Sequence, residues 1–235
     1  PVKIASSELL RNGRRFLVRA RSTDGAEGLI VANDDRVVDL YPILLRRVIP
    51  YFVGKDARDL DSLVDGVYAH DSNYKMQGLA LWVPVASVEF ALLDMMAKMI
   101  GKPIGELLGG VVRRDVAVYR ASGNRGNTPE AEIEFLQKLV ADTGAKAIKF
   151  RLGGRMSKNR DSLPGRTERL IPLVRKTFGD KMTLYADSNS SYDVPEAIRI
   201  GRIMEEHNYG FYEEPCEFDH LEETKRVADA LTIPV

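Results

Sequence analysis

The sequence predicts an α/β protein in which a region of mixed helices and strands, residues 1–110, precedes a parallel sheet built from residues 111–235. From residue 115 onward, short apolar runs alternate with helical segments at a spacing of about 30 residues, which is typical of βαβ units. Before that point the chain shows a hairpin pattern followed by helical periodicity. These observations leave open whether the parallel sheet is doubly wound or closed as a barrel.

The first region is expected to begin with an antiparallel hairpin. Residues 15–21 alternate between apolar and polar side chains, Thr23-Asp24-Gly25 supplies a turn, and residues 28–32 return. Helical spacing of apolar residues then predicts three helices, the last of which stops at Gly101-Lys102-Pro103. These helices are expected over residues 38–52, 59–68 and 85–100.

The second region is expected to contain four complete strand–helix units. Thr128 is a suitable N-terminal cap for the first of its helices, and Pro195 suits the first turn of the third. Because a fifth strand would begin at the end of the chain and leave an open apolar edge, we expect the protein to continue beyond Val235 by more than about a hundred residues. The strands are expected at 116–121, 146–152, 182–187, 210–214 and from 232, and the helices at 129–142, 166–178, 195–207 and 220–230.

Composition narrows the possible partners. Lys plus Arg and Asp plus Glu both number 34, so no basic excess favours nucleic acid or an acidic membrane surface. The longest apolar stretch, Gly78 to Val88, is predicted to be too short to span a bilayer. The single cysteine, Cys216, excludes an intrachain disulfide and fits a reducing cytoplasm. A small metabolite is therefore the expected partner.

Polar residues at the strand ends are the candidates for chemistry, because parallel α/β proteins gather their active sites at the carboxyl ends of the strands. The second strand ends with Lys149 and Arg151, the third with Asp187 and Asn189, and the fourth with Glu213. Alternation along a strand places these five on one face. A single strand-end carboxylate is more often a cap or a loop-bridging group, but the convergence of two cations and two carboxylates favours a functional site.

Two carboxylates from neighbouring strands suit Mg²⁺, which prefers hard oxygen ligands. Asp187 and Glu213 are the predicted ligands, and a third is expected from the strand that follows Val235. The ion would hold a substrate carboxylate and stabilise the charge that develops when the adjacent carbon loses a proton. Lys149, crowded by Arg151, is the expected acid–base group.

Other polar residues are expected to be supporting or surface groups. Glu214 should point to the opposite face, as a salt-bridge residue or a support for the site. The histidines, which are expected at the surface, are His70, His207 and His220.

Several motifs together resemble the mandelate racemase and muconate lactonizing branch of the enolase superfamily, over nearly the whole chain. Val88 to Asp94, with Gly101-Lys102-Pro103 and Leu107 to Gly110, is similar to that family's junction between cap domain and barrel. Asp187-Ser188-Asn189 and Tyr212-Glu213-Glu214-Pro215 are similar to the stretches that carry its first two metal ligands. The resemblance implies a TIM-like (β/α) barrel whose first half is residues 111–235, with an N-terminal α+β cap domain, residues 1–110, whose loops close over the substrate.

The resemblance also implies roles for the strand-end residues. Asp187 and Glu213 would bind Mg²⁺, with Asn189 a polar neighbour in the substrate site. Lys149 matches the first lysine of the family's Lys-x-Lys motif, but Arg151 replaces the second, and a guanidinium cannot readily accept a proton. It could orient a carboxylate or stabilise an enolate.

The replacement of that lysine affects the expected reaction. Because a two-base racemase needs a base on each face of the carbon, Arg151 favours dehydration of a sugar acid, whose hydroxyls the polar loop 153–160 would suit. The alternatives are a racemase, epimerase or cycloisomerase, and a catalytically silent barrel protein. The expected partner is a small-molecule carboxylate, and the expected state is a cytoplasmic homo-oligomer.

Overall fold

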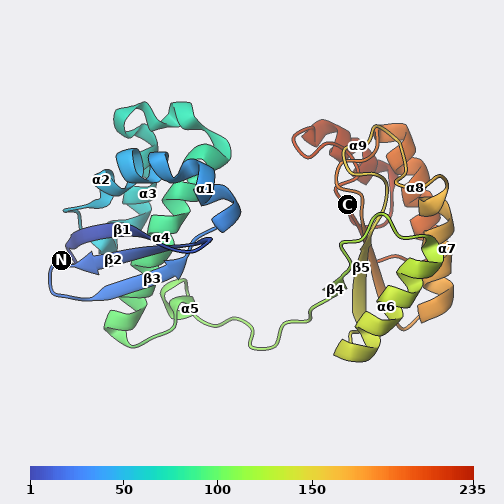
Figure 1. Ribbon diagram of the computed structural model, residues 1–235, viewed down its shortest axis with the longest axis horizontal. Helices are drawn as coiled ribbons and strands as arrows, with labels where there is room; N and C mark the ends of the chain where they lie inside the picture. The colour runs from blue at the N-terminus through green and yellow to red at the C-terminus, as the bar shows by residue number, and fades with distance from the viewer. The chain divides into compact units, whose positions relative to one another are not determined.

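A three-stranded antiparallel sheet forms the base of the first of two units into which the chain divides, Pro1–Arg114. The computed structural model describes residues 1–235 (Figure 1). The sheet has the order β1 (Ile4–Asn12), β2 (Arg15–Ser22), β3 (Glu27–Val31). The predicted hairpin is β2 and β3. β1 was not predicted, because its run Ser6-Ser7-Glu8-Leu9-Leu10 lacks clean alternation. Its register with β2 also shifts between Ile4 and Ser6.

Helices complete the first unit, and the three predicted ones are present with changed bounds. The predicted helix 38–52 starts earlier and is divided into three consecutive elements, 59–68 is shifted by one residue, and 85–100 starts at Gly78. The central helix α4 packs on β2 and β3, where Gly28 leaves no room for a Cβ against the backbone oxygen of Ala91. In chain order the helices are α1 (Asp34–Ile43), the π-helical η1 (Leu44–Val48), α2 (Ile49–Phe52), the 3₁₀ turn η2 (Ala57–Asp59), α3 (Leu60–Ala69), η3 (His70–Met76), α4 (Gly78–Ile100) and α5 (Ile104–Leu107).

The length of α4 corrects one prediction. Its apolar pattern continues past Val88 to Ile100, so that its 23 residues are long and apolar enough to cross a membrane by length and composition alone. Half of the apolar window is buried inside the first unit, and Val88, Leu92 and Met95 are inaccessible to solvent. The central helix of a folded domain can be as long and as apolar as a membrane-spanning helix, and α4 is the central helix of the first unit.

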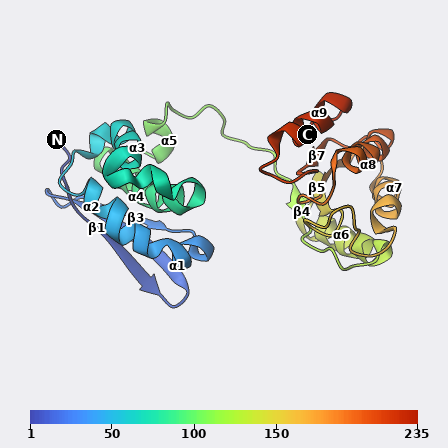
Figure 2. The same cartoon turned by 90° about the horizontal axis from the view of Figure 1, so that it is seen from above.

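The second unit, Asp115–Val235, contains a four-stranded parallel sheet in the order β4-β5-β6-β7. Figures 1 and 2 show this unit in the C-terminal part of the chain. Its strands are β4 (Arg120–Ala121), β5 (Ala147–Arg151), β6 (Thr183–Asp187) and β7 (Phe211–Glu213). The predicted connecting helices are α6 (Pro129–Thr143), α7 (Arg166–Phe178), α8 (Val194–Glu206) and α9 (Leu221–Ala230). Thr128 caps α6 as expected, with its Oγ1 accepting from Ala131 N at 3.2 Å.

The two faces of this sheet differ. One carries Ile148, Phe150, Leu184, Ala186 and Tyr212 into a core shared with the four helices. The other carries a cluster of aromatic rings, in which Tyr185 and Phe211 stack with their centroids 4.0 Å apart. Tyr119 meets both rings edge-on. The alternation predicted for the strands is therefore realised, with the polar strand-end residues on the aromatic side.

Two predicted strands differ from the structure. Only Arg120 and Ala121 of the predicted strand 116–121 pair with β5. In the register that sets Arg120 opposite Ile148, residue 116 would lie opposite Gly144. Gly144 ends α6 in a left-handed conformation and precedes β5, so residue 116 has no extended strand to pair with. Residues 232–235 form no strand, although Pro234 O accepts from Tyr212 N at 2.9 Å.

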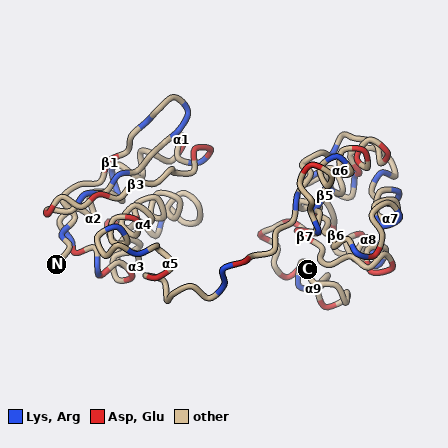
Figure 3. The backbone as a smooth tube through the Cα atoms, turned by 90° about the horizontal axis from the view of Figure 1, so that it is seen from below, with Lys and Arg blue, Asp and Glu red and all other residues tan.

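Charge is distributed evenly over both units. Acidic and basic residues are interspersed along the chain, as Figure 3 shows. With 34 residues of each sign, neither sign dominates the molecule.

Candidate active site

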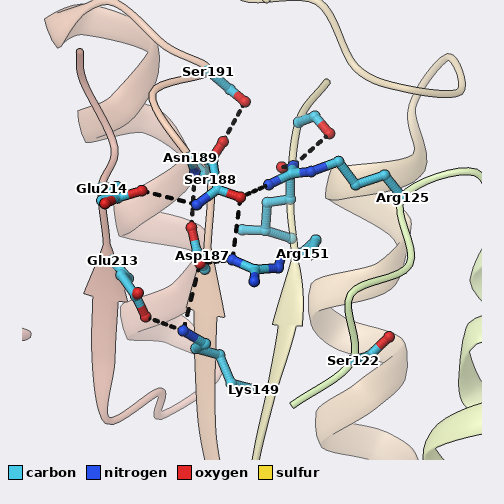
Figure 4. A network of polar contacts seen from close by, with 12 residues as sticks. Ser122, Arg125, Lys149, Arg151, Asp187, Ser188, Asn189, Ser191, Glu213 and Glu214 are labelled. Carbon is cyan, nitrogen blue, oxygen red and sulfur yellow. Dashed lines mark hydrogen bonds and ion pairs between the residues drawn. The ribbon is translucent and has the colours of Figure 1, made fainter. Parts of the chain in front are cut away.

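The carboxyl ends of three parallel strands bring charged side chains into one row. In the register of β5 and β6, Arg151 lies opposite Asp187, and in that of β6 and β7, Asp187 lies opposite Glu213 (Figure 4). Parallel pairing in register places side chains of equal parity on the same face of a sheet. The three residues therefore project together on the aromatic side.

Lys149 joins the two carboxylates of this row. Its Nζ lies 2.5 Å from Glu213 Oε2 and 3.5 Å from Asp187 Oδ2. The residue is only 5% exposed, and its ammonium lies 5.2 Å from the centre of the Tyr119 ring. A buried lysine needs compensating negative charge, and here two carboxylates supply it.

Asp187 is the most enclosed carboxylate of the row, at 1% exposure. Its Oδ1 accepts from Asn189 N at 2.8 Å, and its Oδ2 pairs with Arg151 Nη1 and with Lys149. The Glu213 side chain is more open, at 34% exposure. The row thus has a buried carboxylate in its middle and, in Glu213, an end that solvent or a small molecule can reach.

The donor chemistry of the row fits a hard divalent cation. Asp187 and Glu213 come from adjacent strands, and both approach within 3.5 Å of a single cationic nitrogen. Two carboxylates that can share one cation are the ligand type that Mg²⁺ prefers, with water and substrate oxygens completing the shell. These two residues are the ones that would hold the ion.

Asn189 lies in the turn after β6, so strand alternation does not explain why its side chain faces the site. β6 ends at Asp187, and Asn189 has a left-handed backbone with φ of 42°. Asparagine tolerates this region better than most residues. Its Oδ1 accepts from Arg151 Nη1 at 3.1 Å and from Arg125 Nη2. The expected convergence holds, but through a turn instead of an extended strand.

Glu214 corrects a prediction for the same reason. Alternation predicted that it points to the opposite face, as a salt-bridge residue or a support for the site. Its φ of 46° ends the extended geometry, so the predicted direction is wrong, and of the two roles the supporting one is observed. Its Oε2 instead accepts from Asn189 Nδ2 at 2.8 Å, and it pairs with no cation (Figure 4). It therefore supports the site from the side of the β7–α9 loop.

Sequence reasoning missed Arg125, which lies in the loop between β4 and α6. Burial, followed by the nearby positive charges of Arg151, Arg155 and Arg166, lowers the pKa of Arg125 to about 10. Its guanidinium donates to Leu152 O, to Gly153 O at 3.1 Å and to Asn189. It lies in a loop beyond the end of β4, so it is not among the strand-end residues that alternation identifies.

The polar loop 153–160 is held by the loop that follows β6. Met156 N donates to Asn189 O at 2.9 Å, and Asn159 N donates to Ser191 O at 2.8 Å. The Asn159 side chain also exchanges hydrogen bonds with Asp193, at 2.7 and 2.8 Å. Part of the polarity of this loop therefore serves loop packing, and its contact with sugar hydroxyls stays a prediction.

The histidines lie away from the row. The side chains of His70 and His220 are 42% and 50% exposed, which confirms their predicted place at the surface. His207 is half-buried at the end of α8, with Nδ1 2.8 Å from Ile203 O.

The chain is similar to known proteins both in sequence and in structure. Residues 131–235 match the family model described as "Enolase C-terminal domain-like". An arabinonate dehydratase from Saccharolobus solfataricus is 28% identical over 199 residues, which are 84% of this chain and 51% of that protein. The chain spans about half the length of the curated relatives it matches.

Two solved structures share the fold over nearly all of the chain. A protein from Roseobacter denitrificans, described as a candidate racemase, is 36% identical with a TM-score of 0.88, and the match covers 98% of this chain and 62% of that one. A mandelate racemase/muconate lactonizing protein from Paracoccus denitrificans, complexed with magnesium, is 27% identical with a TM-score of 0.87, covering 99% and 64%.

Proposed function

We propose that this chain, which belongs to the mandelate racemase and muconate lactonizing branch of the enolase superfamily, carries the Mg²⁺-binding edge of an enzyme that removes a proton next to a carboxylate. The predicted fold class, an α/β barrel type with an N-terminal α+β unit, is confirmed by the parallel sheet and by the solved structures that match it. The activity, substrate and assembly of the whole protein belong to the proposal.

The contact of Lys149 with both strand-end carboxylates carries this proposal. A buried amine at 2.5 Å from Glu213 and 3.5 Å from Asp187 places a group that can exchange a proton beside a pair that can hold a cation. When bound, the divalent ion would supply Lewis acidity toward the substrate carboxylate and stabilise developing negative charge. The ion is Mg²⁺ in this proposal, which the magnesium complex of the Paracoccus relative supports.

Each charged residue then has a distinct task. Lys149 Nζ, in its uncharged form, accepts the proton from the α-carbon, since an amine nitrogen can act as a base and a guanidinium cannot. Arg151 stays protonated, and it orients a substrate carboxylate or hydroxyl, because only its Nη1 is bound to protein groups. Asn189 lines the substrate side of Asp187.

Dehydration of a sugar acid is the proposed reaction. Curated relatives at 28–30% identity are named as dehydratases of arabinonate, L-talarate/galactarate and D-galactonate. Arg151 also supports it, since loss of water needs one base for the proton and one acid for the leaving hydroxide, not a base on each face. The proposed substrate is therefore a small polyhydroxylated carboxylate.

The test is incubation of the full-length protein, stripped of metal and then given Mg²⁺, with a panel of aldonic and aldaric acids. A 2-keto-3-deoxy product from at least one acid is expected, and it should disappear in the Asp187→Asn variant. The exposed Glu222→Gln variant is the matched control, because Glu222 makes no side-chain contact with the row. If no acid in the panel yields product and Asp187→Asn leaves metal binding unchanged, the proposal fails.

Racemisation or epimerisation is the second candidate, because the Roseobacter protein described as a candidate racemase is the more similar relative at 36% identity. The distinguishing measurement is incubation in D₂O. Deuterium at the α-carbon of recovered substrate, without loss of water, selects this candidate over dehydration.

A further inference from the structure

Arg125 connects three of the loops that surround the charged row. It lies in the β4–α6 loop, and its Nη1 donates to the carbonyl oxygens of Leu152 and Gly153, which follow β5. Its Nη2 donates to Asn189 Oδ1, in the loop after β6. Its own carbonyl oxygen accepts from Ser162 Oγ at 2.6 Å. Hydrogen bonds therefore fix both the guanidinium group and the backbone carbonyl of Arg125.

The Arg125 contact determines how the Asn189 amide is oriented. Arginine can only donate hydrogen bonds, so the amide atom that faces both Arg125 and Arg151 must be the oxygen. The amide nitrogen then points to Glu214, where it donates to Oε2 at 2.8 Å. With its side chain held on both sides, Asn189 keeps a left-handed backbone at φ of 42°.

That backbone conformation matters because Asn189 N donates to Asp187 Oδ1 at 2.8 Å. The bond occupies one carboxylate oxygen and turns the other, Oδ2, toward Lys149 and Arg151. We propose that Arg125 is a positioning residue for the metal ligand Asp187, acting through Asn189 to keep Oδ2 directed at the place where a cation binds. This inference rests on the proposed function, since it takes Asp187 as a Mg²⁺ ligand.

The donors of Arg125 argue for positioning over substrate binding. Its two terminal nitrogens already donate to three protein oxygens. Arg151, in contrast, uses only Nη1 for protein contacts and keeps its other donors for a ligand. A guanidinium committed to the loops stabilises their arrangement and has little capacity left for a substrate carboxylate.

The sign of the effect on Mg²⁺ affinity separates positioning from simple electrostatics. Removing a positive charge beside a cation site should tighten Mg²⁺ binding if charge alone matters. Removing a residue that orients a ligand should weaken it, and loss of such a supporting contact costs about 10- to 100-fold in metal affinity. The two explanations predict opposite changes.

The experiment is calorimetric titration of Mg²⁺ into the metal-stripped full-length protein. Arg125→Met is expected to raise the Mg²⁺ Kd about 10- to 100-fold, and Arg125→Lys to raise it less, because lysine keeps the charge but loses the fork. Arg155→Met is the matched control. It removes the same charge nearby, from an exposed side chain without a hydrogen bond, and should leave the Kd unchanged or lower it.

Two further readouts exclude a merely structural role. Raising the Mg²⁺ concentration should restore the kcat of Arg125→Met, whereas loss of folded protein would not be restored. In an Asn189→Ala background, Arg125→Met should add little further loss, because residues acting through one path are not additive. Circular dichroism checks folding, and if Arg125→Met does not fold, the Arg125→Lys titration decides.

The outcomes distinguish this inference from the proposed function. If wild type binds Mg²⁺, Asp187→Asn abolishes binding, and Arg125→Met binds as tightly as wild type or tighter, only the positioning role is overturned. If wild type does not bind Mg²⁺ at all, the proposed function fails first.

Discussion

Asp187 and Glu213 face each other across the β6–β7 pair, and one lysine nitrogen contacts both of their carboxylates. Two carboxylates held this close repel each other unless a cation lies between them. The arrangement therefore requires positive charge at one place, which Lys149 supplies and a divalent ion can supply more strongly.

Neutralising either carboxylate should remove the metal site. Asp187→Asn and Glu213→Gln are each expected to weaken Mg²⁺ binding by at least about 10-fold, because hard divalent ions depend on carboxylate charge. The loss should be larger for Asp187, the buried ligand. Calorimetric titration of both variants beside Glu222→Gln measures this, and equal binding by all three would contradict it.

Lys149→Met should separate catalysis from metal binding. The turnover of the active acid is expected to fall by about 100-fold or more, which is the contribution of a positioned acid–base group. Mg²⁺ binding should persist, since the ion replaces the lost cation between the carboxylates. Steady-state rates and metal titration give the two values, with exposed Lys146→Met as control. A variant that turns over normally would show that Lys149 is not the base.

Arg151→Lys should alter the course of the reaction. It creates a Lys-x-Lys pair in which the second residue can accept a proton, and α-carbon exchange with solvent is expected to increase. Mass spectrometry of substrate recovered from D₂O measures the exchange. Arg151→Gln should show no increase in α-carbon exchange, because an amide side chain carries no charge and does not act as a base. Exchange that is the same in wild type and Arg151→Lys would mean that this position does not limit proton transfer.

Glu205 should make the second unit sensitive to acid. Burial raises its pKa, but hydrogen bonds from Thr232 and the pairing with Arg202 outweigh this and lower the pKa to about 2. Because the folded-state value lies below the ordinary 4.5, its stabilisation is present above that pH and is lost as the pH falls toward about 2. Urea unfolding midpoints of wild type and Glu205→Gln should differ at pH 6 and converge between pH 4 and about 2. A constant difference over that range would refute this assignment.

Gly28→Ala should destabilise the first unit. An added Cβ would collide with the backbone oxygen of Ala91 and with Met95, where β3 lies against α4. Overpacking of this kind typically costs about 1–3 kcal/mol, and here the obstacle is backbone that cannot turn away. Gly105→Ala, in open space within α5, is the control and should be neutral or slightly stabilising. Thermal unfolding compares the two, and equal midpoints would contradict the expected clash.

Periodicity predicted most of the second unit because its strands are short, in register and buried on one side. Lys149, Arg151, Asp187 and Glu213 lie on one face because each sits within or at the end of an extended strand. The same rule failed at Glu214, where a left-handed residue ends the alternation. The catalytic and metal-binding roles of these residues stay predictions.

Other features were missed for physical reasons that a pattern does not encode. The third helix was predicted from residue 85, yet α4 begins at Gly78 and keeps Pro84 in its interior, where a proline ordinarily ends or kinks a helix. Arg125 lies in a loop, and its importance depends on contacts with residues far along the chain. Such long-range hydrogen bonds leave no periodic signal.

The in-register ends of β5, β6 and β7 also constrain how this protein can change. A one-residue insertion or deletion within any of these strands would swap the outward and inward sets of side chains, putting Phe150 or Tyr212 where a charge now stands. Evolution or protein engineering can therefore diversify this edge by exchanging residues in place and by varying loop length, while the lengths of the strands themselves have to be kept.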